Sequence, residues 1–130
     1  TPTSSVADPR GRRWAWAGAI GWAALLFALS ATPGDADGFD WPLLSFPGAD
    51  KLAHAGLYAV LGALLRLPSG RTGVAVTWAG AYGVSDEAHQ AFVPGRSPDP
   101  LDWLADVAGA WVGATLVAGF ARRARRRTVE

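Results

Sequence analysis

Four apolar segments, separated by Pro- and Gly-rich connections, are the feature of this 130-residue chain that most limits its fold. Residues 14–31 carry no charge, and a run of that length can cross a membrane as a helix. The later segments predict helices at about 51–67, 72–93 and 101–121, ended by turn-forming residues. The two middle segments have short uncharged runs, which suit a buried helix of a soluble protein as well as a membrane span.

The distribution of charge decides between these two interpretations. If four helices cross in turn, one side receives ten of the twelve Lys and Arg residues, and the other receives nine of the eleven Asp and Glu residues. A soluble bundle has no reason to sort its charges, whereas basic connections of membrane proteins stay in the cytoplasm. We therefore expect an all-α, integral membrane four-helix bundle in the cell membrane, multi-pass, with both termini cytoplasmic.

The resulting plan has three parts: a flexible cytoplasmic tail at 1–13, a transmembrane domain at 14–121 and a basic cytoplasmic tail at 122–130. One alternative stays open for residues 14–31, which also have the basic start and small residues of a cleaved signal peptide. The absence of Met at position 1 is consistent with a trimmed or incomplete start.

Composition excludes several classes of site. The chain has no Cys, so neither a disulfide framework nor a thiolate metal site is possible. The Arg residues at 122–127 follow an apolar helix, which favours anchoring to anionic lipid head groups over binding to nucleic acid. Membrane lipids are the partners that the sequence predicts.

A polar stretch at 85–106 lies between two apolar segments, and the expected topology brings it to the outer membrane face. The same face receives the start of the second helix, where Asp50, His54 and Tyr58 are each four residues apart. Glu87 is preferred over its neighbour Asp86 as the inward carboxylate. The polar residues expected to converge there are Asp50, Lys51, His54, Glu87, Gln90, Arg96, Asp102 and Asp106.

Carboxylates grouped with one His can hold a hard divalent cation, or zinc with mixed nitrogen and oxygen ligands. They can also serve as general acid and base. Glu87, His54 and Asp102 are the candidates for these catalytic or ligand roles, and Arg96 is the expected counter-ion and anion clamp. Plainer roles stay open: Asp50 and Asp102 as helix caps, Lys51 as an interfacial anchor, and His89 as an exposed residue.

Three motifs in order resemble the VanZ-like family over about residues 50–118. They are Asp50-Lys51-x-x-His54-x-x-x-Tyr58, then Ser85-Asp86-Glu87-x-x-Gln90 with Phe92-x-Pro94-Gly95-Arg96-Ser97, then Asp102-x-x-x-Asp106-x-x-Gly109. The resemblance implies a small multi-helix membrane protein, and the family's founding member is associated with teicoplanin resistance. Where the family commonly has Asn, this chain has Asp106, which adds a negative charge.

Three functional hypotheses follow. The first is a protein that binds or acts on an envelope lipid or a glycopeptide-type ligand at the outer face. The second is a non-catalytic structural or accessory protein whose polar cluster is a helix-packing network. The third, a small transporter, is disfavoured because the polar groups stop at one membrane face. The sequence leaves the metal, the ligand and the oligomeric state open.

Overall fold

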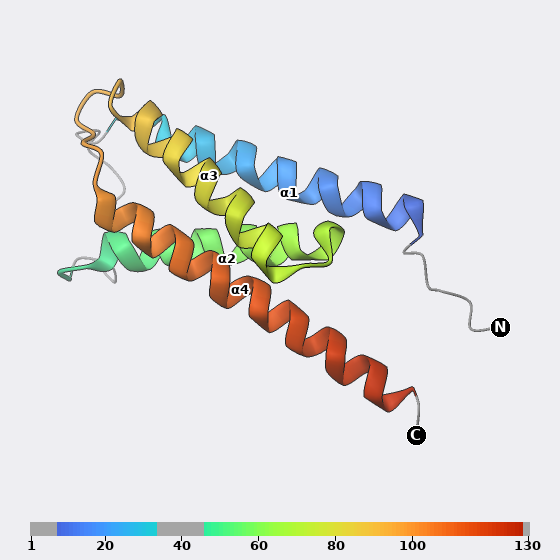
Figure 1. Ribbon diagram of the computed structural model, residues 1–130. Helices are drawn as coiled ribbons and strands as arrows, with labels where there is room; N and C mark the ends of the chain where they lie inside the picture. Colours follow the sequence, from blue (N-terminus) through green and yellow to red (C-terminus); the bar gives the residue numbers. More distant parts are fainter. Residues whose placement is uncertain (1–7, 34–45, 129–130) are drawn as a thin grey trace.

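A computed structural model describes residues 8–33 and 46–128 of the chain. Within these residues the protein is all-α, with four helices and no strand: α1 (Pro9–Ser30), α2 (Ala49–Ser69), α3 (Thr72–Gln90) and α4 (Pro100–Arg127). The helices alternate in direction, so the start of α1, the α2–α3 turn and the end of α4 lie toward one end of the bundle (Figure 1). The end of α1, the start of α2 and the α3–α4 connection lie toward the opposite end. This confirms the predicted all-α four-helix class.

α1 and α4 are much longer than the sequence predicted, α2 extends by two residues at each end, and α3 is shorter. α1 begins at Pro9, because the Asp8 side chain caps it by accepting a hydrogen bond from the Arg10 N–H. α4 continues to Arg127, so most of the expected basic tail is helical; Arg is a good helix former, and its charge suits a helix C-terminus. α3 ends at Gln90, where the chain enters turns. Most of the acidic connection between α1 and α2 lies outside the described residues.

Neither Asp50 nor Asp102 caps a helix, although that role was open for both. Gly48, with φ of 87°, occupies the cap position of α2, and Asp50 lies inside the helix. Asp99 caps α4 by accepting from the Leu101 N–H at 2.9 Å, which leaves Asp102 within the first turn. Asp102 is therefore free to pair with Lys51 of α2, whereas Asp50 pairs with Lys51 within its own helix.

α2 and α4 pack with their backbones in direct contact. A Cβ atom built on Gly109 would overlap the carbonyl of Ala55, and one built on Gly113 would overlap the carbonyl of Ala59. Gly62 has the reciprocal relation to Ala110. Small residues four apart allow this approach in membrane helices, and Gly109 and Gly113 have this spacing on α4.

The bundle carries small residues inside and large apolar residues outside. Its centre contains fully buried alanines, among them Ala75, Ala79, Ala110 and Ala114. Large apolar side chains are exposed on all four helices, for example Trp14, Trp78 and Trp111. Soluble monomers rarely expose so much apolar surface, whereas a lipid-facing bundle has this distribution.

Length and hydropathy allow two of the helices, α2 and α4, to cross a membrane. Only 28% of the apolar window in α2 and 33% of that in α4 is buried, unlike the core helix of a soluble protein. α1 and α3 do not reach the same hydropathy. Together with the exposed apolar surface, these helices favour a membrane protein.

Candidate functional site

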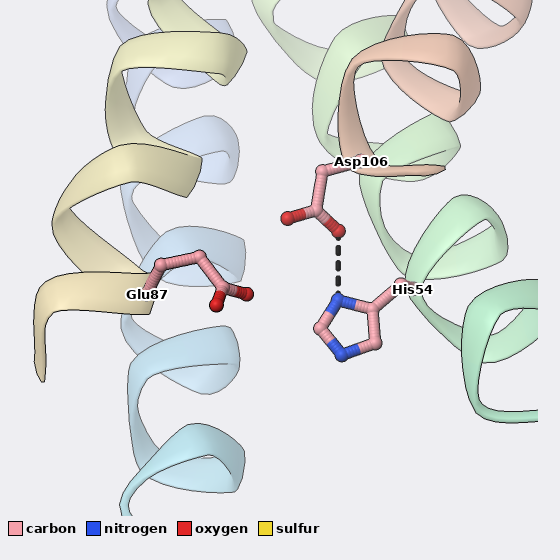
Figure 2. A group of neighbouring side chains, drawn as sticks. All are labelled: His54, Glu87 and Asp106. Atoms are coloured by element: carbon pink, nitrogen blue, oxygen red, sulfur yellow. Dashed lines mark hydrogen bonds and ion pairs between the residues drawn. The ribbon is translucent and has the colours of Figure 1, made fainter. Parts of the chain in front are cut away.

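Side chains from three helices meet near one end of the bundle. We call His54 of α2, Glu87 of α3 and Asp106 of α4 the inner cluster (Figure 2). His54 Nδ1 lies 2.8 Å from Asp106 Oδ1, and one ligand atom of each residue lies within 4.8 Å of the others. The Asp106 side chain is 0% exposed, and the other two residues are partly buried. Sequence reasoning grouped these three residues, and the structure brings them together.

A second layer of charges surrounds the Lys51 ammonium, which we call the Lys51 network. Lys51 Nζ lies 2.8 Å from Asp102 Oδ1, 3.0 Å from Asp99 Oδ2 and 3.2 Å from Asp50 Oδ2. Asp102 joins the two layers, because its Oδ2 lies 3.8 Å from His54 Nε2. Lys51 is thus a bridge between α2 and the start of α4, rather than only an interfacial anchor.

Asp99 precedes α4 and connects the Lys51 network to α3. Its backbone N–H donates to Glu87 Oε2 at 2.8 Å. Hydrogen bonding from the Leu101 N–H, followed by that from Lys51, lowers the pKa of the Asp99 carboxyl below its ordinary value. Asp99 therefore stays ionised at neutral pH as a partner of Lys51.

Several buried oxygens of the site have no hydrogen-bonding partner among the described protein groups. Asp106 Oδ2 and Glu87 Oε1 are two of them, and Asp86 Oδ1 and the Tyr58 hydroxyl are two more. Figure 2 shows the free oxygen of Asp106 on the side that faces Glu87. Buried carboxylate oxygens without partners are costly, so this space suits a polar or cationic guest.

Arg96 does not lie over the cluster as expected. Its Nε donates to the Thr32 carbonyl at 3.0 Å, at the end of α1, and it makes no ion pair with a carboxylate of residues 8–33 or 46–128. The reason is the course of the α3–α4 connection, which turns toward α1. Lys51 takes the counter-ion place that the sequence suggested for Arg96.

The remaining candidates have separate positions. Asp50 lies at the rim, with its side chain 64% exposed and only Lys51 as a charged partner. Gln90 is buried on α3, with no hydrogen bond to the inner cluster within the part of the chain that the structure describes. His89 is half-buried rather than exposed, because its ring stacks on Phe27 at 4.4 Å.

Three residues near the site were not assigned a site role from the sequence. Asp99 could have been found, because Asp followed by Pro at the start of an apolar segment is a helix-start signal. Asp86 is buried, although the sequence favoured only its neighbour Glu87 as the inward carboxylate. Tyr58 is also buried, one turn beyond His54 on α2.

A family model described as VanZ/LLP1 matches residues 15–121, which is most of the chain and includes every residue of the site. No curated protein and no solved structure gives a match.

Proposed function

Because the chain belongs to the VanZ/LLP1 family, we propose that it is a multi-pass protein of the cell membrane whose inner cluster binds a ligand at the outer face. The ligand is the polar head of an envelope lipid or a glycopeptide-type molecule. A contribution to glycopeptide resistance is part of this proposal.

The charges at the two ends of the bundle support this orientation. Arg66 and Arg71 flank the α2–α3 turn, which lies toward the same end as the start of α1 and the Arg-rich end of α4 (Figure 1). The acidic cluster and Lys51 belong to the opposite end. Basic ends are retained in the cytoplasm, so the site opens outward.

One observation carries the binding proposal: three helices bring His54, Glu87 and Asp106 into a partly exposed cluster with unpaired carboxylate oxygens. Polar and ionisable groups within a membrane domain are costly and usually serve a function. The inner cluster is acidic, because neither nearby basic residue pairs with its carboxylates. Lys51 forms ion pairs with three other aspartates, and Arg96 donates to the Thr32 carbonyl. A ligand with a protonated amine can bind these carboxylates directly, whereas a phosphate needs a bridging cation.

A structural role is the second candidate, favoured by the contacts between helices. Lys51 connects α2 to Asp102 of α4, and Glu87 connects α3 to the Asp99 N–H. If this network only holds the bundle together, disrupting it lowers the amount of folded protein without any ligand being involved.

The variant Glu87→Gln separates the two candidates. The Gln amide oxygen can still accept from the Asp99 N–H, so we expect normal membrane abundance. We expect wild-type protein in detergent to bind teicoplanin or a phosphate-bearing envelope lipid, and the variant to bind at least about tenfold more weakly. Calorimetric titration measures the affinity. Cells that express each form report teicoplanin susceptibility.

The matched control is Thr77→Ala on the same helix, whose hydroxyl bonds only to the Gly73 carbonyl of its own turn. It should bind like the wild type. The binding proposal fails if neither ligand binds wild-type protein, or if Glu87→Gln and Thr77→Ala bind equally well. Loss of Glu87→Gln from the membrane would favour the structural candidate instead.

A further inference from the structure

The inner cluster has two carboxylates for one imidazole, and this donor set points to a metal ion. Glu87 and Asp106 are two carboxylates beside one His, and no Lys or Arg of the described residues forms an ion pair with either. Lys51, the one Lys of the chain, is shared by Asp50, Asp99 and Asp102 instead. Two carboxylates and a neutral imidazole match the charge of one divalent cation.

We infer that His54, Glu87 and Asp106 bind one divalent cation of the zinc class. Mixed imidazole and carboxylate donors suit zinc and similar transition-metal ions better than calcium or magnesium, which prefer oxygen alone. This inference deepens the proposed function by adding a cofactor to the same site.

The donor positions are close to those of a coordinated ion. Two ligands at about 2.1 Å from a metal stand roughly 3.0 to 3.4 Å apart. His54 Nδ1 and Asp106 Oδ1 are 2.8 Å apart, and the ligand atoms of all three residues fall within 4.8 Å. Binding of one ion by all three residues requires the Glu87 carboxylate to move closer to the other two.

The burial of Asp106 also favours a bound cation, in addition to the short distances between the three residues. Its side chain is 0% exposed, and its Oδ2 has no partner among the described protein groups, nor does Glu87 Oε1. A buried carboxylate oxygen without a partner is unfavourable, and coordination of a cation satisfies it.

Asp102 is placed to orient the imidazole. His54 Nε2 has Asp102 Oδ2 as its charged neighbour at 3.8 Å. In the structure, Nδ1 faces the closer acceptor, Asp106 Oδ1 at 2.8 Å, and donates to it. When a cation takes the place of that proton, the remaining imidazole proton lies on Nε2, on the side of Asp102 Oδ2. Asp102 is thus a positioning residue, itself fixed by Lys51.

The cation gives an acidic site a means to bind an anionic ligand. Three protein ligands leave one position open in a tetrahedral zinc site. A phosphate oxygen of an outer-leaflet lipid can occupy that position. Without the cation, the carboxylates would repel the phosphate. This last step rests on the proposed function, whereas metal binding itself does not.

The test is zinc binding by the full chain, purified in detergent with its affinity tag removed. We expect one Zn²⁺ per chain by calorimetry and elemental analysis. Glu87→Gln and Asp106→Asn should weaken binding at least about tenfold, because loss of a ligand costs no less than loss of an outer-shell partner. The rim variant Asp50→Asn, a matched change of carboxylate to amide outside the inner cluster, should bind like the wild type.

A second measurement uses only wild-type protein, so it tests zinc binding even if the variants do not fold. Wild-type protein should unfold at a higher temperature with Zn²⁺ than with a chelator. The inference is overturned if wild-type protein binds no Zn²⁺ and the two unfolding temperatures agree. It is also overturned if Asp50→Asn weakens binding as much as Glu87→Gln does. Neither measurement depends on membrane orientation, so the proposed function can fail separately.

Discussion

Gly113→Ala is expected to destabilise the bundle by about 3 kcal/mol or more, and Gly109→Ala by a similar amount, at the upper end of overpacking effects. The added Cβ would overlap the carbonyls of Ala59 and Ala55, which are backbone atoms and cannot rotate away. α2 and α4 must then separate, and this moves His54 away from Asp106. Thermal unfolding in detergent and the amount of protein in the membrane measure the loss.

Gly119→Ala is the matched control on the same helix, because nothing lies within 4 Å of a Cβ built there. It should be neutral or slightly stabilising, since Ala favours helix more than Gly does. Equal stability of Gly113→Ala and Gly119→Ala would contradict the close packing of α2 and α4.

His54→Ala is the second change with a large expected effect, about 3 kcal/mol of unfolding free energy in the presence of a chelator. It removes the 2.8 Å partner of Asp106, whose side chain is 0% exposed, and leaves a buried carboxylate without compensation. Adding Asp106→Asn to His54→Ala should recover part of the loss, because the uncompensated charge is then gone.

His89→Ala is the corresponding control. His89 stacks on Phe27 away from the inner cluster, so its loss should cost only about 1 kcal/mol. Thermal unfolding of the single and double variants provides the comparison. If the effects of His54→Ala and Asp106→Asn simply add, the two residues are not coupled, and the inner cluster is not a unit.

Sequence reasoning could predict the helices and most of the site because those features depend on local spacing and charge. Apolar segments and turn residues predicted four helices. The separation of basic from acidic residues predicted that the polar ends of these helices lie on one side. Spacing of three or four residues then placed His54 and Asp106 on inward faces. These inferences need only helical periodicity and alternating direction, and the structure has both.

The remaining features depend on loop paths and tertiary contacts that periodicity does not encode. The α3–α4 connection turns Arg96 toward Thr32, and Lys51 becomes the counter-ion instead. Gly48 and Asp99 occupy the cap positions, which moves Asp50 and Asp102 into helices. Asp86 and Glu87 are adjacent, yet both are at least partly buried, because α3 packs against more than one neighbour.

Cysteine accessibility in intact cells tests whether the polar site opens at the outer membrane face. The chain has no Cys, so a single introduced thiol is a clean probe. Asp50 is exposed at the rim of the site, and Gly73 is exposed near the opposite end, with nothing within 4 Å of an added Cβ. A membrane-impermeant maleimide should label Asp50→Cys in intact cells, and Gly73→Cys only after the membrane is opened. Labelling of Gly73→Cys but not of Asp50→Cys in intact cells would mean that the site faces the cytoplasm.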